Sequence, residues 1–134
     1  MRQAALVRRL SKGGVVRGAA PGREAFLVAA AAQGLRPVVV DLGGVSTKAA
    51  LLRRLAVALG FADDFGMNLD ALRDSLADLV LDADPPGLAI LLTGLPARPA
   101  AAAQTRPAAE AILEVMQDCA GALGGGRRLV VLAS

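Results

Sequence analysis

Seven aspartates gather between Asp63 and Asp84, in a stretch of 22 residues whose one cation is Arg73. Seven negative charges against one positive give a local charge of −6, in a chain of formal net charge +3. The other five aspartates of this segment are Asp64, Asp70, Asp74, Asp78 and Asp82. Carboxylates at this density can bind a metal ion or meet a basic protein surface. This acidic segment is therefore the first candidate for a functional site.

Enzyme chemistry finds little support elsewhere in the sequence. The chain has no histidine, so it lacks the usual general base and the commonest metal ligand. Cys119 is the single cysteine, and its place beside an apolar stripe favours a buried, inert thiol. The glycine pairs match no phosphate loop, and the aspartates do not have EF-hand spacing. We therefore expect no enzyme, no cofactor and no metal site.

The acidic segment is expected to present its charges on a helix that begins after Asn68, a good N-cap residue. Asp70, Asp74 and Asp78 then fall within about 80° of one another around the helix. Like charges at this spacing cost a few tenths of a kcal/mol. An ordinary solvated face is one interpretation, and a surface that docks on a basic partner is the favoured one. The apolar stripe on the far side comprises Leu69, Leu72, Leu76, Leu79 and Val80.

The elements around this helix predict the α/β class. Short apolar runs at 37–42, 88–92 and 129–132 are typical of buried parallel strands. Helices are expected at 23–33, from Ser46 as N-cap to Gly60, and from Thr105 as N-cap to Leu123. Asp118 lies near the end of the last helix, where the helix dipole disfavours an anion, so we expect it to have a partner.

The N-terminal segment carries the opposite charge. Residues 1–40 hold seven basic residues against Glu24, a charge of +6. Residues 1–12 are expected to be weakly structured, and Val15 and Val16 to form a short strand. The segment is either a solubilising, partly disordered arm or a surface for nucleic acid or a membrane. No signal peptide or membrane span is expected, and the lone cysteine favours a cytoplasmic protein.

The stretch Phe65-Gly66-x-Asn68-Leu69-Asp70-Ala71-Leu72-x-Asp74-x-Leu76 resembles the core motif of the barstar family, small cytoplasmic inhibitors of barnase-type ribonucleases. The resemblance covers about the last 100 residues. It implies a barstar-like domain at 36–134 and a basic extension at 1–35. It also implies a three-layer α/β fold with a small parallel sheet of three strands, or four if the extension adds one.

By position, the resemblance implies that Asp74 is the central inhibitory residue and that Asp118 is a second acidic contact. The expected partner-binding residues are Asp64, Phe65, Gly66, Asn68, Asp70, Arg73, Asp74, Asp78 and Asp118. The family usually has tyrosine at position 64 and tryptophan at 73, so the resemblance leaves the target open. The predicted function is an immunity protein that occludes the basic active site of a ribonuclease or nuclease toxin and is a monomer when free. The alternative is a nucleic-acid-associated or regulatory module that acts through the basic N-terminus.

Overall fold

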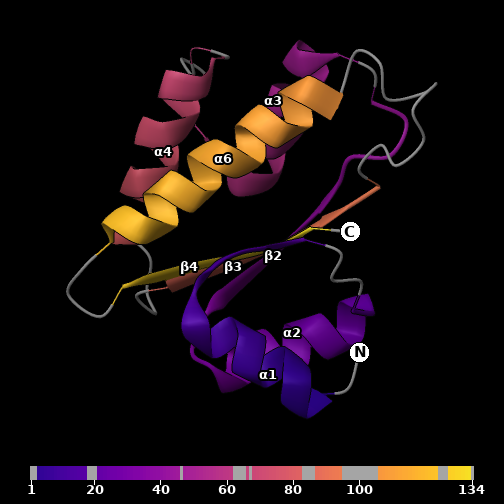
Figure 1. The fold of residues 1–134 in the computed structure, drawn as a ribbon, viewed down its shortest axis with the longest axis vertical. Helices are drawn as coiled ribbons and strands as arrows, with labels where there is room; N and C mark the ends of the chain where they lie inside the picture. The colour runs from indigo at the N-terminus through magenta and orange to yellow at the C-terminus, as the bar shows by residue number, and fades with distance from the viewer. Residues whose placement is uncertain are drawn as a thin grey trace.

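The apolar runs of the sequence form one parallel sheet in the computed structural model of the chain (Figure 1). The structure describes residues 3–17, 21–45, 47–61, 66, 68–82, 87–94, 106–123 and 127–133. The strands are β1 (Gly14–Arg17), β2 (Arg36–Asp41), β3 (Gly87–Thr93) and β4 (Arg128–Ala133). Their order across the sheet is β1-β4-β3-β2, and every neighbouring pair is parallel. The sequence-based prediction of a small parallel sheet is confirmed, and the N-terminal segment supplies the fourth strand that the sequence left open.

The most apolar strand lies inside the sheet, and a more polar strand lies at its edge. In β3, every residue from Gly87 to Leu92 is buried, because strands and helices cover it on all sides. The edge strand β2 is more polar and contains Pro37, which cannot donate a backbone hydrogen bond and is tolerated at an edge. Its central residue Val38 pairs with Ile90 of β3, which in turn pairs with Val131 of β4.

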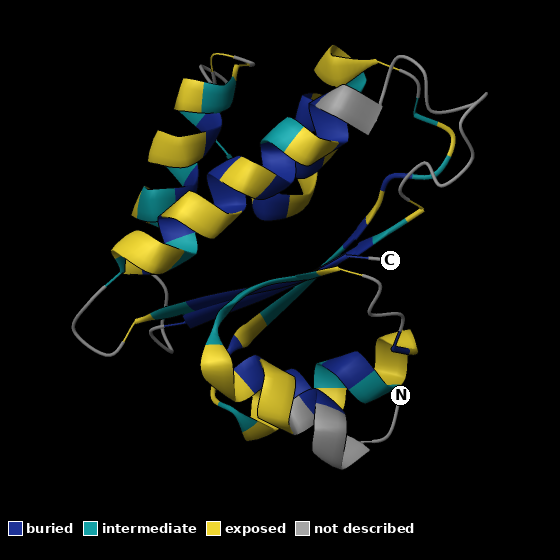
Figure 2. Ribbon diagram, viewed as in Figure 1, coloured by how far each residue is buried: buried dark blue, intermediate teal, exposed yellow. Residues whose placement is uncertain are grey.

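Helices cover both faces of the sheet (Figure 1). One face carries α3 (Lys48–Leu59), α4 (Leu69–Asp82) and α6 (Arg106–Ala122), and the other carries α1 (Gln3–Lys12) and α2 (Arg23–Ala32). Each face has its own hydrophobic cluster. The sides of the helices that face the sheet are buried and their outer sides exposed (Figure 2). Three layers result, as the fold prediction required.

The N-terminal segment is folded where the sequence predicted weak structure. Residues 3–12 form α1, and its side chains Leu6 and Leu10 are 0% exposed. They pack with Phe26 of α2 against the sheet side chains Leu91 and Leu132. The prediction for residues 1–12 was therefore wrong over the described part, because this face of the sheet needs an apolar cover that local sequence does not reveal.

The helix ends follow ordinary capping chemistry, with one correction. Thr47 caps α3, with its hydroxyl oxygen accepting a hydrogen bond from the Ala50 amide at 3.1 Å, so the N-cap is one residue later than the predicted Ser46. Gly60 ends α3 in the left-handed conformation with φ of 71°, as predicted. Ser46 itself and the predicted cap Thr105 lie outside the described residues.

Candidate functional site

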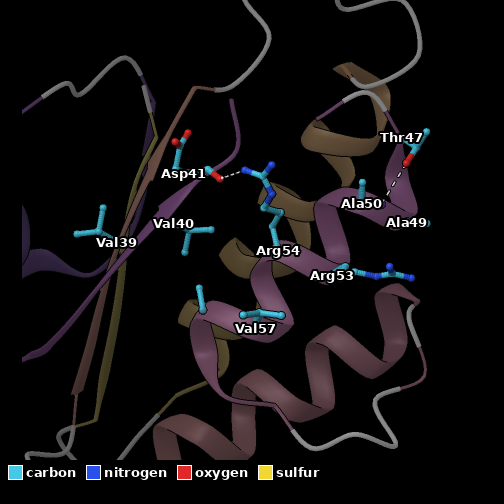
Figure 3. Close-up of a pocket in the computed structure, with 10 residues that line it drawn as sticks. Val39, Val40, Asp41, Thr47, Ala49, Ala50, Arg53, Arg54 and Val57 are labelled. Atoms are coloured by element: carbon cyan, nitrogen blue, oxygen red, sulfur yellow. Dashed lines mark hydrogen bonds between the residues drawn. The ribbon is translucent and has the colours of Figure 1, made fainter. Parts of the chain in front are cut away.

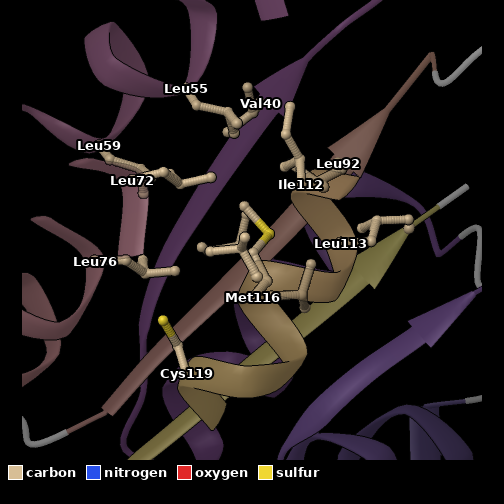
Figure 4. Packing of buried hydrophobic residues seen from close by; sticks show 14 of the residues in the cluster. Val40, Leu55, Leu59, Leu72, Leu76, Leu92, Ile112, Leu113, Met116 and Cys119 are labelled. Carbon is tan, nitrogen blue, oxygen red and sulfur yellow. The ribbon is translucent and has the colours of Figure 1, made fainter. Parts of the chain in front are cut away.

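Helix α4 has two chemically distinct faces. Leu72, Leu76 and Val80 are buried, and Figure 4 shows Leu72 and Leu76 pointing into the same core as Ile112 and Met116. Leu69 and Leu79 are partly buried against this core. The predicted apolar stripe therefore holds the helix against the rest of the fold.

The opposite face of α4 is acidic. Asp70, Asp74 and Asp78 are all exposed, one helical turn apart. Among the described residues, no basic side chain forms an ion pair with any of these three carboxylates. Asp70 also lies in the first turn, where the helix dipole favours an anion. The fold thus leaves three aligned carboxylates open to solvent.

The start of α4 is fixed by Asn68. Its side-chain oxygen accepts a hydrogen bond from the Ala71 amide at 2.8 Å, and its side-chain nitrogen donates to the Gly66 carbonyl at 3.1 Å. A Cβ atom on Gly66 would lie 3.3 Å from that side-chain nitrogen, so glycine leaves the room that this amide needs. The N-cap prediction for Asn68 is confirmed. The other predicted residues of this loop, Asp64 and Phe65, lie outside the described residues.

Asp118 has a partner within the chain. Its carboxylate oxygen lies 3.2 Å from a guanidinium nitrogen of Arg73, and the two side chains are 57% and 51% exposed. The packing of α4 against α6 brings these residues together across 45 positions of sequence. The sequence indicated that Asp118 needs a partner, but it did not identify Arg73. An exposed pair of this kind contributes about 0–1 kcal/mol to stability.

Cys119 follows Asp118 in α6 and lies among the buried residues of the core (Figure 4). It is 6% exposed, and its thiol approaches the backbone carbonyl oxygen of Arg73 at 3.7 Å. Burial raises the pKa of the thiol above its usual value; Arg73 lowers this pKa, whereas Asp118 and Asp74 raise it further. A buried thiol with a raised pKa is a poor nucleophile, which agrees with the inert role expected from the sequence.

A groove of about 540 Å³ separates the exposed sides of α4 and α6. Its rim carries Arg73, Asp74 and Asp118, whereas Asp70 and Asp78 lie outside it on the same exposed face of α4. Leu81 and Arg127 also line the groove, which the sequence did not indicate because only tertiary packing brings them together. The remaining lining residues are Ala77, Cys119, Ala122 and Leu123. The arrangement offers carboxylates of α4 and α6 around an apolar floor.

A larger hollow of about 620 Å³ lies elsewhere, between α3 and the edge strand β2 (Figure 3). Arg54 reaches across it and donates to the carbonyl oxygen of Asp41 at 2.8 Å. The Asp41 carboxylate in turn accepts from the Gly43 amide at 2.8 Å. These polar groups are therefore engaged in holding the strand end and α3 together, and none of the predicted site residues lines this hollow.

Neither a metal site nor a membrane-spanning helix is found in the described part of the chain. No three cysteine, aspartate or glutamate side chains there converge on a point where a metal ion could bind. Within the same residues, no helix has the length and apolar character that a membrane crossing requires.

The fold and the site together define a small α/β protein that exposes an acidic helix beside a groove. The family model described as Barstar (barnase inhibitor) matches residues 35–133, well over half of the chain. The chain therefore belongs to the barstar family. Members of this family are not enzymes but inhibitors, and they bind ribonucleases. None of the curated proteins that were compared with the chain matches it.

Proposed function

We propose that this protein is an immunity protein that binds a cognate ribonuclease or nuclease toxin and occludes its basic active site. The proposal rests on one observation above all, the exposed row of Asp70, Asp74 and Asp78 on a helix of a barstar-family fold. An active site that holds nucleic-acid phosphates is lined with cations, and aligned carboxylates can occupy the same positions. Asp74 is the central contact of the proposal because it adjoins both the acidic row and the groove.

The ion pair between Arg73 and Asp118 shapes what this surface can bind. An isolated arginine beside Asp74 would repel a basic target, but Asp118 offsets the Arg73 charge at 3.2 Å. The target should therefore offer cations to Asp70 and Asp74, and a hydrogen-bond acceptor where the arginine is presented. We propose a target surface of mixed charge, different from one that would accept an aromatic residue at position 73. Asp64, Phe65, Gly66 and Asn68 complete the proposed surface as the loop that presents α4.

The remaining features of the proposal concern the setting. We propose that residues 36–134 form the inhibitory domain and that residues 1–35 add a cover to its sheet. The protein would act without catalysis of its own, as a monomer in the cytoplasm of the cell that produces the toxin. The lone cysteine, buried in the core, is compatible with this reducing compartment.

The proposal is tested by an inhibition assay. A nuclease encoded beside this protein, or a barnase-type ribonuclease, is mixed with the chain and a fluorogenic RNA, and cleavage is followed over time. We expect stoichiometric loss of cleavage, with an association rate that falls as salt rises. The variant Glu114→Gln serves as a control and should inhibit as the parent chain does, because Glu114 is an exposed carboxylate of α6 that does not line the groove. Full cleavage at a large excess of the chain, by both kinds of nuclease, would refute the proposal.

A further inference from the structure

A second charged surface lies where α1 ends and β4 begins, and it adjoins the groove between α4 and α6 through Arg127. Two adjoining hollows of about 380 Å³ each share Lys12 and Gly13. The first is also lined by Arg8 and Arg9, and the second by Arg127. We call Arg8, Arg9, Lys12 and Arg127 the basic surface. No carboxylate lines either hollow.

The backbone around this surface is fixed by Arg128 and by the turn at Gly13. Arg128 donates to the carbonyl oxygens of Ser11 and Gln33, at 3.1 and 3.0 Å, and so ties the ends of α1 and α2 to β4. Gly13, with φ of 75°, permits the close approach of Arg128, because a Cβ there would lie 3.3 Å from the arginine side chain. Glycine at this position therefore allows Arg128 to pack against the turn.

The four cations of the basic surface are unpaired within the described part of the chain, unlike Arg17 and Arg73. Arg17 is paired with Glu110, and Arg73 with Asp118. Within the described part of the chain, Arg8, Arg9, Lys12 and Arg127 form no ion pair and make no side-chain hydrogen bond. Arg9 and Lys12 do favour the negative end of the α1 dipole, but this effect fades beyond the last turn and does not account for Arg8 and Arg127.

We infer that the basic surface binds the phosphodiester backbone of nucleic acid, independently of base sequence. A row of cations without carboxylates matches the regular negative charge of phosphates better than the mixed charge of a protein. Base recognition by aromatic stacking has no candidate on this surface, because no aromatic residue lines either hollow. Membrane insertion is disfavoured, since the two leucines of α1, Leu6 and Leu10, are already buried in the core.

The salt dependence of binding supplies a quantitative test. Each phosphate neutralised on a duplex contributes about −0.9 to the slope of log K against log salt, so four contacts predict a slope of about −3.6. The intact chain is titrated against a fluorescein-labelled DNA duplex of about 20 base pairs, with anisotropy read between about 50 and 200 mM salt. Affinity should fall roughly 150-fold over this fourfold range of salt.

The variants change the surface without removing the N-terminal segment, whose deletion would strip Leu6 and Leu10 from the core. Arg8→Gln/Arg9→Gln should reduce the slope to about −1.8, because two phosphate contacts are lost. Lys48→Gln/Arg53→Gln makes the same change of net charge on exposed residues of α3 and should leave the slope unchanged. Circular dichroism verifies that both variants remain folded.

Several outcomes would overturn the inference. These are absence of duplex binding at the lowest salt, an equal loss of affinity in the α3 control, and binding to anionic phosphatidylglycerol vesicles but not to the duplex. The inference does not rest on the proposed inhibition, and the titration contains no nuclease. A failure of duplex binding would therefore not count against inhibition through the acidic face of α4, and a failure of inhibition would not count against duplex binding.

Discussion

Replacing Asn68 tests how the fold positions the acidic helix. Asn68 makes two side-chain hydrogen bonds, as acceptor from the Ala71 amide at 2.8 Å and as donor to the Gly66 carbonyl at 3.1 Å. Loss of an N-cap acceptor costs about 1 kcal/mol, and loss of an exposed hydrogen bond costs about 0.5 kcal/mol. Asn68→Ala should therefore lower the free energy of unfolding by about 1.5 kcal/mol.

Two further variants separate these contributions. Thr47→Ala removes the N-cap of α3, where the side chain accepts a single hydrogen bond at 3.1 Å, so it should cost about 1 kcal/mol. Asn68→Asp keeps the cap acceptor, loses the donor to Gly66, and adds a negative charge at the positive end of α4. Because the last two effects oppose each other, this variant should stay within about 0.5 kcal/mol of the parent protein.

The assay is urea unfolding followed by far-ultraviolet circular dichroism, since the chain has no tryptophan or tyrosine for fluorescence. The midpoints should rank the parent protein and Asn68→Asp highest, then Thr47→Ala, then Asn68→Ala. If Asn68→Ala changes the free energy of unfolding by less than about 0.3 kcal/mol, the cap does not hold α4 as described. Equal losses in the Asp and Ala variants would likewise contradict the assignment of the acceptor.

Three other perturbations address the core, the ion pair and the thiol. Phe26→Ala should cost about 3–5 kcal/mol in a single urea transition, because this side chain is fully buried between α2 and the sheet; a loss below about 1 kcal/mol would refute its place in the core. A double-mutant cycle with Arg73→Ala and Asp118→Ala should give a coupling of about 0.2–1 kcal/mol that shrinks in about 1 M salt. Zero coupling at low salt would show that the pair does not form. Burial raises the pKa of Cys119, so the folded state holds the thiol proton more tightly than the unfolded state does. The thermal midpoint should therefore fall as pH rises above about 8.5, and Cys119→Ala should have a smaller slope; identical slopes would contradict a buried thiol.

The acidic helix was predictable because its information is local. The spacing of Leu72 and Leu76 fixes which side of α4 is buried, and the aspartates at Asp70, Asp74 and Asp78 then fall on the exposed side. The cap at Asn68 is equally local, since its side chain bonds to residues within three positions. The strands β2, β3 and β4 could be predicted from apolar runs for the same reason.

Long-range packing decides the features that the sequence left open. Two buried leucines among charged residues gave no strong helical signal for α1, which is held by the sheet face that it covers. The pairing of Arg73 with Asp118 joins residues 45 positions apart, so only the packing of α4 on α6 reveals it. Asp118 carried an indirect signal, because its unfavourable place near a helix end required a compensating charge. The predicted N-cap of α3, Ser46, was wrong by one residue, because the adjacent serine and threonine are both suitable caps and the structure uses Thr47.

The affinity of the Asp74→Ala variant for the cognate nuclease is the measurement that tests the central claim most directly. Truncation of a charged hot spot typically costs at least about 2 kcal/mol, a range that complexes of barnase inhibitors themselves helped to define, so Kd should rise about 30-fold or more. Glu114→Ala, a matched change on an exposed carboxylate of α6 outside the groove, should leave Kd within about threefold of the parent value. If Asp74→Ala binds and inhibits as well as the parent protein, the acidic face of α4 is not the inhibitory surface.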